Sequence, residues 1–161
     1  MGNEVLNPHE VLELLNAEGS VKILVTLDEA GLPHPAVKSS LQSDGEHIIY
    51  LEFLESSRTN RYMIRSLWFD RMVSILVLSA DERSYKITAL PVRAIVNGKL
   101  FQRYYELARE KYGSPDLSTA WVLKPATVIE ETLEKRTAEE SKNRSYFLHL
   151  DRLAKDHRGA V

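Results

Sequence analysis

The chain has 161 residues, 43% of them hydrophobic, and its 21 basic and 23 acidic residues give a formal net charge of −2. This length is typical of one domain, and the near-neutral balance offers no positive field for nucleic acid or an anionic membrane. The absence of cysteine excludes disulfides, thiolate metal sites and a cysteine nucleophile. With no apolar signal region or membrane-spanning run, we expect a single soluble, cytoplasmic domain over residues 1–161.

Helix and strand signals follow one another along the chain. Asn7 and Pro8 start a helix with an apolar face, and Gly19 ends it. The apolar, β-branched segments predict six strands, at residues 21–27, 34–43, 47–54, 72–79, 84–97 and 120–131. A short helix is expected at 61–68 and an amphipathic helix at 99–113. Pro91 lies inside the fifth predicted strand and indicates either an edge strand or a bulge.

The segment after residue 131 forms a charged tail with a few apolar residues near its end. Helical spacing there predicts a docking helix from about residue 143 to 153, carrying Tyr146, Phe147, Leu150 and Leu153. The barrel-forming part is expected at about residues 8–131 and the tail at about 132–161.

Six strands in meander order, interrupted by a short and a longer helix, predict a mainly β (α+β) fold built on a small antiparallel barrel. The strands do not alternate regularly with helices, which argues against a doubly wound parallel sheet. The sequence also has no G-x-G-x-x-G and no Walker-type loop. A nucleotide would therefore not be held in a Rossmann or P-loop manner.

The most informative segment is Glu55-Ser56-Ser57-Arg58-Thr59-Asn60, between an apolar run and a predicted helix. Backbone N–H groups at a helix N-terminus and the macrodipole attract an anion. Arg58 can add a bidentate donor suited to phosphate, and Ser57 and Thr59 can each add a hydroxyl. The alternative is an ordinary capped helix start, because Ser, Thr and Asn are favoured there. Glu52 and Glu55, beside this turn, are expected to point to solvent or to pair with Arg58 or Arg61.

The order of these motifs resembles a known family. A strand ends in Thr-Leu-Asp-x-x-Gly-x-Pro-His (26–34), two strands follow, and a Ser-Arg turn opens a short helix before a valine-rich strand. This is similar to the pyridoxamine 5′-phosphate oxidase-like, FMN-binding split-barrel superfamily. The resemblance implies a six-stranded antiparallel split β-barrel with flanking helices, FMN as cofactor, and a homodimer with the flavin in a groove between subunits.

The resemblance also implies which residues contact FMN. The family's phosphate cluster corresponds to Ser57, Arg58 and Thr59, with Asn60 and Arg61 as additional contacts. The strand beside the flavin ring and ribityl chain corresponds to Val37, Lys38, Ser39 and Ser40. Lys38 would stabilise the anionic reduced flavin, or it is a solvated strand lysine. Trp121 would cover the ring, or it is a core or interface tryptophan.

The expected function is that of an FMN-binding protein, acting as a flavin-dependent oxidoreductase on an unknown small-molecule partner. A true pyridoxamine 5′-phosphate oxidase is not expected, because no tryptophan follows Trp121 in the region that completes that enzyme's site. The alternatives are a flavin storage or sensing protein without turnover and a haem-binding split-barrel relative. No metal site is expected, since the five histidines lack ligand spacing. His34 is either a ligand or proton donor, or a turn histidine.

Overall fold

The computed structural model describes residues 8–113 and 116–144. The chain divides into two compact units, residues 1–130 and 131–161, and each is described by itself. The predicted docking helix with Tyr146, Phe147, Leu150 and Leu153 falls outside the described residues from position 145 onwards. None of the helices in the described ranges combines the length and the apolarity needed to cross a membrane.

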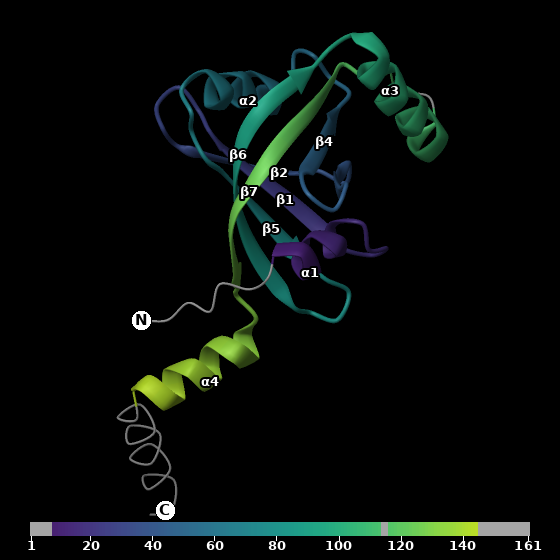
Figure 1. The fold of residues 1–161 in the computed structure, drawn as a ribbon. Coiled ribbons are helices and arrows are strands. Elements are labelled where there is room, and N and C mark those ends of the chain that lie inside the picture. Colours follow the sequence, from purple (N-terminus) through teal and green to yellow (C-terminus); the bar gives the residue numbers. More distant parts are fainter. Residues whose placement is uncertain (1–7, 114–115, 145–161) are drawn as a thin grey trace, which may run out of the picture. The chain divides into compact units, whose positions relative to one another are not determined.

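The first unit is built on one antiparallel sheet of seven strands in the order β2-β1-β5-β6-β7-β4-β3. The strands are β1 (Val21–Leu27), β2 (Pro33–Val37), β3 (Leu41–Ser43), β4 (Ile48–Glu52), β5 (Val73–Leu78), β6 (Ser84–Ile95) and β7 (Thr119–Glu130). The long strands β6 and β7 curve together through the middle of the sheet (Figure 1). The mainly β, antiparallel prediction is confirmed.

The predicted count of six strands is wrong, because the segment 34–43 forms two strands instead of one. The chain turns at Lys38–Ser40, where the Leu41 N–H donates to the Lys38 carbonyl at 3.2 Å. The Ser40 hydroxyl then donates to the carbonyl of Leu51 on β4 at 2.6 Å. The turn thus joins β2, which pairs with β1, to β3, which pairs with β4.

Pro91 lies at a bulge, one of the two alternatives that the sequence left open. The pairing of β6 with β7 shifts register between Pro91 and Arg93. The strand is not an edge strand, since β6 pairs with β5 on its other side. The shift lets a residue without an N–H donor occupy a central strand.

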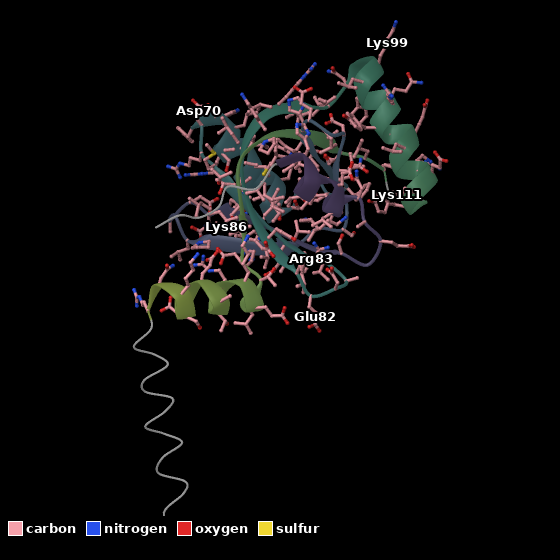
Figure 2. All side chains as sticks on the ribbon, turned by 60° about the horizontal axis from the view of Figure 1, so that its bottom comes forward. Asp70, Glu82, Arg83, Lys86, Lys99 and Lys111 are labelled. Atoms are coloured by element: carbon pink, nitrogen blue, oxygen red, sulfur yellow. The ribbon has the colours of Figure 1, made fainter. Side chains whose placement is uncertain are left out.

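The helices are α1 (Pro8–Leu12), the short 3₁₀ helix η1 (Glu13–Leu15), α2 (Arg58–Trp68), α3 (Gly98–Tyr112) and α4 (Leu133–Asn143). Helix α2 begins at Arg58, earlier than the predicted start at residue 61, so Arg58, Thr59 and Asn60 form its first turn. Figure 2 shows Lys99 and Lys111 at the two ends of α3. Helix α4 belongs to the second unit and has no buried side chain.

Two apolar clusters lie on the two sides of β4. One contains Leu15, Leu24, Met63 and Ile87 with the inward residues of β4 and β7. The second contains Ile49 and Leu51 of β4, which α3 covers through Ala108. Every residue of β4 is therefore buried. Because strand side chains alternate between faces, Tyr50 and Glu52 share the side of β4 that Ile49 and Leu51 do not occupy. The end of β4 thus carries a carboxylate into a buried position immediately before α2.

Candidate functional site

The junction between β4 and α2 holds the central residues of the predicted site. Ser57 is the N-cap of α2, and its Oγ accepts a hydrogen bond from the Asn60 N–H at 2.9 Å. The same hydroxyl donates to Oε2 of Glu52 at 2.7 Å. The Ser57 hydroxyl is therefore used within the protein both as a donor and as an acceptor. Ser57 shapes the first turn of α2, and its side chain is not free to donate to a ligand.

Glu52 is buried, with an exposed fraction of 3%, which differs from the expectation that it points to solvent or pairs with Arg58 or Arg61. Its carboxylate accepts hydrogen bonds from the Tyr50 hydroxyl, the Ser57 hydroxyl and, at 3.0 Å, the Leu54 N–H. The Lys38 ammonium lies 3.7 Å from Oε2. These donors satisfy a charge that would otherwise be costly to bury. The i, i+2 spacing of Tyr50 and Glu52 on a strand was the signal that could have placed them together.

The segment 37–40, predicted to lie beside the flavin, runs from the end of β2 through the turn. Val37 and Ser39 are exposed, and the Lys38 side chain is half-buried against the Tyr50 ring, with Nζ 5.4 Å from the ring centroid. Ser40 is buried by its hydrogen bond to Leu51. Val37 and Lys38 therefore offer accessible groups to a ligand, whereas the Ser40 hydroxyl holds the turn.

Thr59 lies one residue inside α2 and is buried, with an exposed fraction of 3%. Its Oγ1 is 3.5 Å from Nε2 of His34, and the His34 ring packs edge-on against Tyr62 at a centroid separation of 5.1 Å. His34 lies on β2, so these contacts bring β2 against the first turns of α2. The structure thus places His34 beside the predicted phosphate turn.

Arg58 and Arg61 are both exposed on the first turn of α2. Arg61 is paired with Glu29 at 3.7 Å, an exposed ion pair of the kind that contributes little to stability. Across the described part of the chain, the Arg58 guanidinium has no hydrogen-bond or ion-pair partner. Within the same described residues, the backbone N–H groups of Arg58 and Thr59 in the first turn also donate no hydrogen bond. This is the donor set that an anion requires at a helix N-terminus.

Asn60 and Trp121 make contacts within the protein interior. Trp121 has an exposed fraction of 1%, and its indole N–H donates to Oδ1 of Asn60 at 3.0 Å. The Asn60 amide in turn donates to the Glu55 carbonyl at 2.9 Å. Trp121 is therefore a core tryptophan, which was one of the alternatives to covering the flavin ring. Its hydrogen bond to Asn60 supports the first turn of α2.

The structure gathers Ser57, Arg58, Thr59, Asn60 and Arg61 at the start of α2 and joins Lys38 to them through Glu52. Trp121 is joined to this group by its hydrogen bond to Asn60. A separate open cavity of about 1030 Å³ lies beside α3 and contains none of the predicted site residues. Its lining combines polar residues such as His47 and Arg93 with apolar ones such as Leu100 and Leu107. Among the described residues, no group of three or more His, Asp or Glu side chains is arranged to hold a metal ion.

No family model and no curated protein matches this chain. Solved structures do match its fold. HupZ from Group A Streptococcus has a TM-score of 0.63 at 16% identity, covering 78% of this chain and 99% of that one. An FMN-binding protein from Syntrophomonas wolfei has a TM-score of 0.61 at 19% identity, covering 78% and 89% respectively.

A putative pyridoxamine 5′-phosphate oxidase from Lactobacillus delbrueckii has a TM-score of 0.54 at 19% identity, covering 78% of this chain and 93% of that one. The resemblance to the pyridoxamine 5′-phosphate oxidase-like split-barrel superfamily is therefore confirmed as a likeness of fold. At these identities the likeness is one of fold alone, since one fold can carry many functions.

Proposed function

We propose that this chain binds FMN, with the phosphate at the N-terminus of α2, and acts as a flavin-dependent oxidoreductase. The observation that carries the proposal is that, among the described residues, the Arg58 guanidinium has no partner and the N–H groups of Arg58 and Thr59 donate no hydrogen bond. A phosphate monoester presents oxygens that accept from these donors together. The similar Syntrophomonas wolfei protein is described as FMN-binding, which supports the same cofactor here.

The residues present are suited to the two ends of FMN in different ways. Arg58 and the first turn of α2 would hold the phosphate, and Arg61 would join them by exchanging its exposed pairing with Glu29. Residues 37–39 would lie along the ring and ribityl chain, as the resemblance implies. When bound, the flavin supplies electron and hydride transfer at N5 and C4a, and the chain supplies position and electrostatics.

The experiment that tests the phosphate site compares FMN with riboflavin, which lacks the phosphate. Arg58→Ala removes a charge-assisted hydrogen bond worth about 1.5–3 kcal/mol, so the affinity for FMN should fall by about 10- to 150-fold. Riboflavin should bind the wild type and the variant with similar, weak affinity. Both affinities are measured by quenching of flavin fluorescence.

Arg71→Ala is the matched control, because Arg71 is also exposed but follows the opposite end of α2. It should leave the FMN affinity unchanged. Equal losses of FMN and riboflavin in Arg58→Ala would show that Arg58 supports the ring or the fold. An unchanged FMN affinity would instead assign the anion contact to Arg61 or Lys38.

The absorbance spectrum of the purified protein and the mass of its ligand distinguish this proposal from a haem-binding function. Rapid bleaching of bound flavin by NADH or NADPH would support an enzyme. Persistent oxidised flavin under the same conditions would favour the alternative of storage or sensing.

A further inference from the structure

Glu52 occupies a position between the two ends of the proposed FMN site. Its Oε2 accepts from the Ser57 hydroxyl at 2.7 Å and lies 3.7 Å from the ammonium of Lys38. Ser57 in turn caps the helix whose first turn would hold the phosphate. Lys38 belongs to the segment that would lie beside the flavin ring. One buried carboxylate therefore connects the groups that face opposite ends of the ligand.

The charge of Lys38 is balanced within the protein. Its side chain is 20% exposed, whereas that of Glu52 is 4% exposed, so the two charges are only partly screened by water. Any group near the ammonium therefore experiences the field of a Lys38–Glu52 pair. The field of a single cation would act only if the carboxylate were removed.

We propose that Glu52 is a positioning residue of the flavin site, which fixes Lys38 and the Ser57 cap in one network and cancels the Lys38 charge at the flavin ring. This inference rests on the proposed FMN function. It changes the role of Lys38, because an ammonium paired with Glu52 stabilises the reduced, anionic ring less than an unpaired ammonium would.

The consequence can be measured as the relative affinity for reduced and oxidised FMN. Reduction by dithionite adds two electrons and one proton to the ring and leaves it with one negative charge. Glu52→Gln removes the carboxylate charge and keeps the side chain's size, so the Lys38 ammonium then acts alone on the ring. The ratio of affinities for reduced over oxidised FMN should rise by about tenfold, which is about 30 mV in the two-electron midpoint potential.

Glu55→Gln is the matched control, since Glu55 lies on the same turn but is exposed. It removes the same charge in water and should leave the midpoint potential unchanged. Lys38→Met should lower the affinity ratio by about the same factor as Glu52→Gln raises it, because the uncompensated carboxylate then acts on the ring. The double variant, which has neither charge, should return close to the wild-type potential.

Lys38→Met also tests the inference if Glu52→Gln does not fold. In that variant Glu52 keeps its three donors from Tyr50, Ser57 and Leu54, so the fold should persist. An unchanged potential in Lys38→Met, or a Glu52→Gln potential equal to that of Glu55→Gln, overturns this inference while the FMN proposal stands. A double variant that keeps the full Glu52→Gln shift would show that Lys38 plays no part. A wild-type protein that binds no FMN overturns both proposals.

Discussion

Tyr50 carries its hydroxyl in the core, where the phenol donates to the Glu52 carboxylate. Burial raises the pKa of Tyr50 above its ordinary value of 10.0, and the hydrogen bond and charge of Glu52 raise it further. A tyrosinate at this position would be a buried charge beside a carboxylate. The folded protein therefore keeps a proton that the unfolded chain releases at high pH.

This difference predicts how stability depends on pH. Because the pKa of Tyr50 is raised on folding, its contribution is complete below pH 10.0 and is lost as the pH rises above that value. The free energy of unfolding should then fall by about 1.4 kcal/mol per pH unit from this group. Tyr50→Phe should remove that part of the slope.

Urea unfolding of the wild type and Tyr50→Phe across this pH range measures the effect. Below about pH 9 the difference in unfolding free energy between the two proteins should stay constant, because neither state ionises there. If the unfolding free energies of the two proteins fell in parallel up to pH 11, another group would control the alkaline transition.

At the scale of elements, one hydrogen bond attaches the start of α2 to β7. The Trp121 indole N–H donates to Asn60 inside the core, and β7 pairs with β4 directly at this residue, with Trp121 opposite Tyr50. The first turn of α2, where we propose that the phosphate binds, is thus held by a residue distant in sequence. A rigid first turn holds the N–H groups of Arg58 and Thr59 in place, which favours binding of an anion.

Asn60→Ala should destabilise the fold by about 1–3 kcal/mol, because the buried indole N–H is left without an acceptor. Chemical unfolding measured by circular dichroism gives this value. In a Trp121→Phe background no N–H remains to be satisfied, so Asn60→Ala should then cost less. Equal costs in both backgrounds would show that the Asn60–Glu55 bond, rather than the Trp121 bond, stabilises the turn.

At the scale of the whole molecule, one face of the sheet carries apolar side chains that the first unit leaves exposed. Val37 on β2 lies opposite Ile23 on β1, which in turn lies opposite Leu76 on β5, so the three form a row on one face. Val37 is 69% and Leu76 is 37% exposed. Val37 also belongs to the predicted flavin segment, so this face is continuous with the proposed site.

We propose that a second copy of the chain covers this face in a two-fold symmetric dimer that buries more than about 2,000 Å² in total. Leu76→Glu should shift the protein to monomer, because it places a charge in the apolar row. Leu107→Glu is the control, since Leu107 is 39% exposed on α3, away from this row. Sedimentation of the wild type as a monomer at micromolar concentration would contradict the dimer.

The sequence by itself determined the elements whose signals are local. Strand β1 occupies the predicted residues 21–27, because an apolar run rich in β-branched residues is suited to the pleated surface of a sheet. Pro91 indicated either an edge strand or a bulge, since its missing N–H is a property of the residue, and the pairing of β6 on both sides then decided for the bulge. A capped helix start in residues 55–60 was also open to prediction, because an N-cap bond closes within four residues of chain, and the structure assigns the cap to Ser57.

Only the tertiary structure decided which polar groups are buried and which are free. Glu52 and Arg58 both border the same turn as charged residues, yet Glu52 is buried among donors and Arg58 is exposed without a partner among the described residues. The difference comes from contacts across the fold: Lys38 reaches Glu52 from the β2–β3 turn, and β7 pairs with β4. The interruption between β2 and β3 at Lys38–Ser40 also depends on a contact across the fold, because the Ser40 hydroxyl donates to Leu51 on β4. Local patterns record backbone preference and hydrophobic period, whereas the satisfaction of a buried charge depends on groups that folding brings together from distant parts of the chain.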